Sequence, residues 1–215
     1  MSERKKNQRL NDAIEISLYV ICCFCIVYYT IRGVYAKSIQ ALLIIMVLLL
    51  IRVVVKWTKS EWFPALRFSV LFFITVAMLF ANLFGFYGVI PYLDKMEHVL
   101  SGVILCFVGL LVLRKMIQNQ EVSQFSSRIG VWFALFFSIA MAGCWEIFEF
   151  TTDRLFGLLS QNGSLSDTMV DIICGTVGAA GTALYLAYKA KRHPLSILSG
   201  NEDQVAKKVR SVDPK

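Results

Sequence analysis

Three short polar motifs interrupt an otherwise apolar chain, and they contain the types of side chain that can bind a metal ion or transfer a proton. In chain order they are Asp94-Lys95-Met96-Glu97-His98, Glu146-Ile147-Phe148-Glu149 and Asp167-Thr168-Met169-Val170-Asp171. Each motif lies at the edge of a hydrophobic stretch long enough to cross a bilayer. Ionisable side chains inside or against hydrocarbon are costly, so by default they indicate a functional site.

The spacing of these motifs favours a single shared site. Residues three or four apart lie on one face of a helix, so Asp94 and His98 share a face, as do Asp167 and Asp171. The glutamates of the second motif lie near the end of the intervening span. Because successive spans run in opposite directions, we expect all three motifs to meet on one side of the membrane.

The charge of this site predicts a bound cation. Only Lys95 and Arg154 lie near a larger set of carboxylates, which comprises Asp94, Glu97, Glu146, Glu149, Asp153, Asp167 and Asp171. In a low dielectric, either several of these groups are protonated or a cation binds. Oxygen-rich ligation suits Mg²⁺, Mn²⁺ or Ca²⁺, and a histidine also admits Zn²⁺ or Fe²⁺. We expect a divalent ion, with Zn²⁺, Mg²⁺ and Mn²⁺ as the candidates.

Each residue of the site has an expected role. The predicted metal ligands are His98, Glu146, Glu149 and Asp171, with Asp94 and Asp167 as further ligands or as partners of ligands. The ion would activate water, and the catalytic groups would be His98, Glu146 and Glu149. An anionic substrate group would be held by Lys95 and Arg154.

Simpler interpretations exist for some of these residues. Asp94 with Glu97, and separately Asp167, could cap the helices that they begin. Asp153 could be an ordinary loop residue. Capping does not explain Glu146, Glu149 or Asp171, because these lie inside spans.

Composition and hydropathy predict the elements that position the motifs. Of the 215 residues 57% are hydrophobic, and the mean hydropathy is +0.62, which excludes an ordinary soluble domain. Continuous apolar runs of about 20 residues predict membrane-spanning helices. We predict an all-α bundle of six such helices in one domain, residues 14–190, with spans at about 14–31, 39–55, 68–86, 96–113, 129–150 and 169–188. All the chemistry falls on the last three; in the first three, only Asn82 stands out as an inward polar residue.

The distribution of Lys and Arg predicts the orientation. With the N-terminal segment 1–13 and the polar tail 191–215 in the cytoplasm, all but four of the 22 basic residues lie inside. The four outside are Arg32, Lys37, Lys95 and Arg154. The net charge of +7 is therefore a topology signal, with membrane lipids as partners. The sequence has no basic face with interleaved aromatic residues, so nothing in it indicates nucleic-acid binding. The expected location is the plasma (inner) membrane of a bacterium, with the motifs on its outer side.

The order of the motifs resembles two families of bacterial integral membrane proteins, the YjdF-like and, more distantly, the VanZ-like proteins. The VanZ-like pattern is matched by Asp94-Lys95-Met96-Glu97-His98 at a helix start. The YjdF-like pattern is matched by Glu146 with Glu149, and by Asp167-Thr168 with Asp171 and then Gly175. The resemblance covers about residues 87–182. It implies a multi-spanning bacterial membrane protein of poorly defined activity, with an association with glycopeptide resistance on the VanZ-like side.

Three functions fit these observations. The first is a divalent-metal-dependent enzyme acting on a lipid-linked or envelope phosphate substrate. The second is a non-catalytic, metal-stabilised envelope or interaction protein. The third is a cation- or proton-coupled transporter, which would need polar residues continuing across the membrane.

Overall fold

The computed structural model describes residues 3–58, 63–117, 127–158, 160–161, 163–192 and 195, and these residues contain helices and no strand. In chain order the elements are α1 (Glu3–Ile31), α2 (Tyr35–Thr58), α3 (Pro64–Ile74), the π-helix η1 (Thr75–Leu83), the 3₁₀ turn η2 (Phe86–Gly88), α4 (Leu93–Met116), α5 (Ser127–Phe156) and α6 (Leu165–Arg192). In this part of the chain, six helices are long and apolar enough to cross a membrane, with η1 continuing α3. The predicted all-α, six-span, multi-pass architecture is confirmed.

The helices extend further than the apolar runs that predicted them. α1 begins at Glu3, so most of the predicted N-terminal segment 1–13 is helical. The third span is Pro64–Leu83, which begins and ends earlier than the predicted 68–86. The predicted tail, 191–215, lies outside the described residues apart from Lys191, Arg192 and Leu195. The side of the membrane on which each end lies stays a prediction.

Local sequence explains where these helices begin and end. Gly33 (φ 72°) ends α1: its N–H donates to Thr30 O, and the Val34 N–H donates to Tyr29 O. This is the hydrogen-bond pair of a helix end closed by a left-handed glycine. Pro64 occupies the first turn of α3, where a missing N–H costs nothing.

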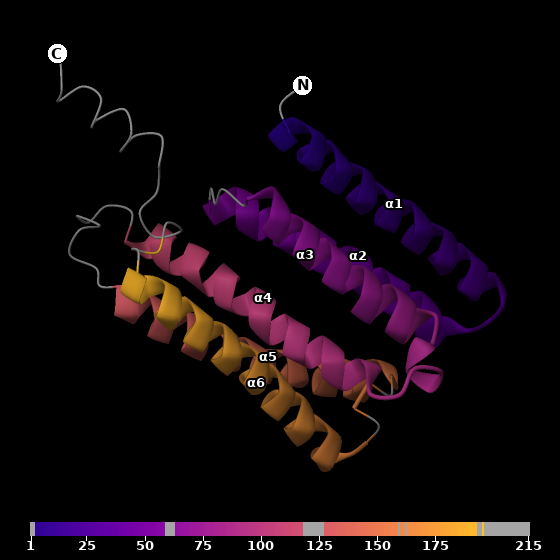
Figure 1. Ribbon diagram of the computed structural model, residues 1–215. Coiled ribbons are helices and arrows are strands. Elements are labelled where there is room, and N and C mark those ends of the chain that lie inside the picture. Colours follow the sequence, from indigo (N-terminus) through magenta and orange to yellow (C-terminus); the bar gives the residue numbers. More distant parts are fainter. Residues whose placement is uncertain are drawn as a thin grey trace.

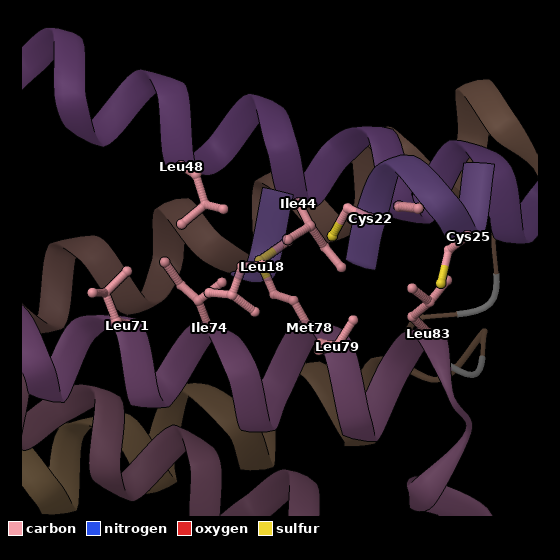
Figure 2. Close-up of a cluster of buried hydrophobic side chains, with 11 residues drawn as sticks. Leu18, Cys22, Cys25, Ile44, Leu48, Leu71, Ile74, Met78, Leu79 and Leu83 are labelled. Carbon is pink, nitrogen blue, oxygen red and sulfur yellow. The ribbon is translucent and has the colours of Figure 1, made fainter. Parts of the chain in front are cut away.

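The helices pack as two groups of three, α1–α3 and α4–α6, with α3 beside α4 (Figure 1). The core of the first group joins α1 and α2 to α3 and η1, as Figure 2 shows. Its buried members include Leu18, Ile44, Ile74 and Leu79. A second core, around Cys106, Leu110, Ala134 and Ala179, lies within α4–α6. A smaller cluster, Leu66, Ile104 and Leu111, joins α3 to α4.

Small residues let α4 and α6 pack closely, as is common for helices in membranes. A Cβ on Gly102 would collide with Gly175 O and lie 2.9 Å from Ala179 N, and a Cβ on Gly178 would collide with Val99 O. The two backbones therefore touch along the half of the bundle that carries the motifs. Gly181, three residues after Gly178 on α6, faces open space. Gly109 faces α5 instead of α6, against Phe137 and Ala134.

Two ends of the bundle can be told apart by charge. At one end α4 and α6 begin and α5 finishes; it carries the three acidic motifs, and we call it the acidic end. The opposite end is the basic end, because α2, α4 and α6 finish there with basic residues in their last turns. These are Lys56 in α2, Arg114 and Lys115 in α4, and Lys189, Lys191 and Arg192 in α6.

The expectation that the first three helices hold little inward polarity is wrong. At their basic end Glu15 of α1, with a side chain 8% exposed, forms ion pairs with Arg67 of α3 (2.7 Å) and Arg52 of α2 (3.4 Å). Arg67 also binds Asp12 (2.7 Å), and the fully buried Asn11 donates to Pro64 O (2.9 Å). This group of residues, the Glu15 clamp, joins the three helices through charge as well as apolar packing.

Candidate metal centre

His98 is the centre of the site that the three motifs form. Its Nε2 lies 3.5 Å from Asp94 Oδ1 on its own helix, 3.8 Å from Glu146 Oε1 of α5 and 3.8 Å from Asp171 Oδ1 of α6. The side chains of His98, Glu146 and Asp171 are each at most 8% exposed. Three helices thus place carboxylate oxygens around one buried imidazole nitrogen.

These distances suit ligands that share an ion better than they suit direct hydrogen bonds. At 3.5–3.8 Å the nitrogen and the oxygens are at or beyond the limit of a hydrogen bond. Ligands about 2.0–2.2 Å from a tetrahedral Zn²⁺ lie roughly 3.3–3.6 Å apart. Ligand atoms of Asp94, His98 and Asp171 all lie within 4.8 Å of one another. This donor set is therefore of the right type and size for a divalent cation.

Glu146 supplies a second observation that fits a cation at this site. Its Oε1 is buried and accepts no hydrogen bond from the described residues, although it faces His98. A buried carboxylate oxygen without a donor is expensive, and most native structures avoid it. A cation beside His98 Nε2 would meet the need of this oxygen.

The other side of Glu146 is held by the loop between α5 and α6. Gln161 Nε2 donates to Glu146 Oε2 (3.2 Å) and to Glu146 O (3.1 Å). Asp153 fixes this loop in turn, because its carboxylate accepts hydrogen bonds from the backbone N–H groups of Ser160 and Gln161, both at 3.0 Å. Asp153 is thus a loop-organising residue, and Gln161 orients Glu146 so that Oε1 faces the histidine.

Lys95 neutralises part of the site through carboxylates that also lie near His98. Its Nζ lies 2.8 Å from Asp94 Oδ2, 2.6 Å from Asp167 Oδ1 and 2.6 Å from Asp171 Oδ1. Asp94 and Asp167 therefore bind through their side chains to other side chains. The side chain that caps α6 is that of Ser164, whose Oγ accepts the Asp167 N–H (3.3 Å), and α4 begins without a side-chain cap.

Two further acids of the motifs, Glu97 and Glu149, have hydrogen-bond partners of their own, and the partner of Glu97 is Tyr87 in η2. Tyr87 donates its hydroxyl to Glu97 Oε2 (2.8 Å), while Glu97 Oε1 is buried and has no partner among the described residues. Burial, and then the Glu97 carboxylate, raise the pKa of Tyr87, so this hydroxyl stays a donor. Glu149, which we expected as a metal ligand, accepts a hydrogen bond from Trp145 Nε1 (3.0 Å) on its own helix.

Arg154 lies in the last turn of α5, at the acidic end, but its side chain lies over an aromatic ring of its own helix. Its guanidinium lies 5.3 Å from the ring centre of Phe150 on α5, and the residue is exposed. The side chains that contact His98 or Lys95 are those of Asp94, Glu146, Asp167 and Asp171, whereas Glu149 pairs with Trp145. Sequence reasoning missed Tyr87 and Gln161, which lie in loops where no helical spacing connects them to the motifs.

The comparisons with known proteins agree with this architecture. Residues 14–192 match the model of a family described as predicted membrane proteins, DUF2238, so the match reaches into all six spans. No curated protein and no solved structure matches the chain. The relation to YjdF-like and VanZ-like proteins stays a prediction from the three motifs. With most of its length matched to one family model, this chain belongs to the DUF2238 family of predicted membrane proteins.

Proposed function

We propose that the acidic end holds one divalent metal ion and is the active site of a membrane enzyme acting on a lipid-linked or envelope phosphate substrate. The observation that carries this proposal is the buried Glu146 Oε1, which accepts no hydrogen bond from the described part of the chain and faces His98 Nε2 at 3.8 Å. The proposed ligands are His98, Glu146, Asp171 and Asp94. A divalent ion bound there would supply an activated water and polarise a phosphoryl oxygen.

The surroundings of the site support an amphiphilic substrate. Large apolar side chains surround the starts of α4 and α6: Val89 is 78% exposed, Tyr92 80% and Leu165 78%. Such residues suit the membrane boundary, where a lipid would keep its tail in hydrocarbon and its headgroup at the polar site. If the basic end is cytoplasmic, this boundary is the outer face of the inner membrane.

Charge favours a substrate whose negative groups contact the metal. Lys95 is engaged with three carboxylates, and Arg154 lies over Phe150. The remaining acids would repel a phosphate unless a divalent ion offset their charge. Glu149, which is outside the proposed ligand set, would then accept a proton from water or substrate.

The halves of α4–α6 away from the acidic end favour an enzyme over a transporter. Ser138 is buried and donates to Gly102 O (2.9 Å), and Thr182 is buried and donates to Gly178 O (2.9 Å). These hydroxyls therefore satisfy backbone carbonyls of the helices. A transport path for cations or protons would instead need polar groups that face one another across the bundle.

Elemental mass spectrometry of the detergent-purified protein tests the proposal. We expect about one Zn²⁺, Mn²⁺ or Mg²⁺ per chain in the wild type and its loss in His98→Ala and Glu146→Gln. Arg154→Gln is the matched control and should keep the metal. Absence of metal from the wild type, even after all three ions are supplied, would refute the metal site.

Activity assays separate the enzyme from a metal-stabilised interaction protein. The metal-loaded wild type should release phosphate from a lipid diphosphate in mixed micelles, and Glu149→Gln should lose this activity while keeping both metal and folded yield. If phosphate release is absent and the metal-site variants lose only folded yield, the ion has a structural role.

A further inference from the structure

Lys95 occupies a cation position of its own beside the proposed metal site. Its side chain is only 23% exposed, and three carboxylate oxygens lie 2.6–2.8 Å from its ammonium nitrogen. Asp94 comes from the same helix, whereas Asp167 and Asp171 come from α6. Distances this short are typical of charge-assisted hydrogen bonds. An ammonium group has three donors, and these three oxygens account for all of them.

The Lys95 position and the His98 position share their carboxylates. Asp94 turns Oδ1 toward His98 Nε2 (3.5 Å) and Oδ2 toward Lys95 Nζ (2.8 Å). Asp171 Oδ1 faces both, at 3.8 Å from His98 Nε2 and 2.6 Å from Lys95 Nζ. Two adjacent cation positions bridged by common acids resemble the arrangement of two-metal phosphoryl-transfer sites, where the ions lie about 3.5–4 Å apart.

We propose that the Lys95 ammonium takes the place of the second metal ion in what would otherwise be a two-cation centre. This inference rests on the proposed function for the first ion, at His98, but it concerns the second position, at Lys95. The tethered ammonium holds Asp94 and Asp171 in place for the first ion. Lys95 is therefore a positioning residue, and the reaction class is a one-metal phosphoryl transfer or hydrolysis.

Removing the ammonium should uncover the second position. In Lys95→Met the apolar part of the side chain remains, but Asp94 Oδ2, Asp167 Oδ1 and Asp171 Oδ1 lose their shared cation. Three converging carboxylates without a counter-charge are unfavourable, so they should recruit a divalent ion such as Mn²⁺, whose preferred ligands are oxygen atoms.

Counting bound Mn²⁺ per chain in detergent-purified protein tests this inference. We expect about one ion in the wild type and about two in Lys95→Met. Lys95→Arg, which keeps the positive charge, should stay at one. Lys37→Met is the matched control: Lys37 lies at the acidic end, but its Nζ donates to the backbone oxygen of Asn82 (2.8 Å), so its removal should add no ion.

The outcomes distinguish this inference from the proposed function. One ion in both the wild type and Lys95→Met would refute the second position and leave the first intact. No ion in the wild type with one in Lys95→Met would refute the proposed function and support the Lys95 position. If Lys95→Met folds only when Mn²⁺ is present during purification, the inference is supported; if added Mn²⁺ restores no folded protein, it is refuted.

Discussion

The close crossing of α4 and α6 predicts that a single methyl group, placed away from every proposed ligand, disrupts the site. The perturbation is Gly102→Ala, one helical turn beyond His98. The added Cβ would overlap Gly175 O and lie 2.9 Å from Ala179 N, both of them backbone atoms of α6. Backbone atoms cannot rotate away as a side chain does, so the two helices must separate.

The size of this separation decides the expected effect. Restoring ordinary contact between the new methyl group and Gly175 O requires about 1 Å of movement. Lys95 Nζ lies 2.6 Å from its oxygens on Asp167 and Asp171, so an added ångström takes both contacts beyond hydrogen-bond range. Overpacking of this kind costs about 1–3 kcal/mol of unfolding free energy.

Unfolding by SDS in mixed micelles, together with metal binding, measures both effects. Gly102→Ala should unfold at lower SDS and bind metal more weakly than the wild type. Gly181→Ala on α6 is the matched control, because its Cβ would meet nothing within 4 Å. Replacing this helix-interior glycine should be neutral or stabilising by about 0.5–1 kcal/mol. Equal behaviour of the two variants would refute the close-crossing argument.

Three further predictions concern the supports of the site and of the fold. Gln161→Leu should weaken metal binding about 10–100-fold in a Mn²⁺ titration, because it removes the donor that orients Glu146; unchanged affinity would contradict this. The raised pKa of Tyr87 means that its stabilising contribution is present below pH 10 and falls above it, as the unfolded tyrosine ionises first; SDS unfolding of wild type and Tyr87→Phe should therefore converge at alkaline pH. Arg67→Met should lower the unfolding free energy by about 3 kcal/mol, since Glu15 then loses its shortest ion pair and keeps the longer contacts with Arg52 (3.4 Å) and the Tyr19 hydroxyl (3.5 Å); adding Glu15→Gln should restore part of it.

Hydropathy predicted the helices well because each span must satisfy its backbone within itself. The boundaries were less accurate because these helices continue past their apolar runs. α1 already includes Glu3 and Asn11, which lie outside the predicted span. The π-helical turns of η1, closed by the Phe84 N–H donating to Leu79 O (3.0 Å), have no sequence signature that hydropathy detects.

The gathering of His98, Glu146 and Asp171 was predictable, because helical spacing and antiparallel connection together place them at one end. The direction of the Arg154 side chain was not predictable, because each step of one residue along a helix turns the side-chain direction by about 100°. Tyr87 and Gln161 reach the site along loops, which have no periodicity to read. Glu15 was predictable in principle: it is an acid inside a predicted apolar span, as Glu146 is, and such residues are functional or paired by default.

The pairing of Lys95 with α6 has a consequence for how the protein is made. Lys95 lies 72 residues before Asp167 and 76 before Asp171, so α4 leaves the ribosome long before its partners do. At about 5–20 residues per second, the delay is roughly 4–15 s. During that interval Lys95 and His98, in the first turns of α4, are without their partners from α6, Asp167 and Asp171. The start of the newly synthesised α4 must therefore stay in a polar environment, beside the insertion machinery or at the membrane surface, until α6 has been synthesised and inserted.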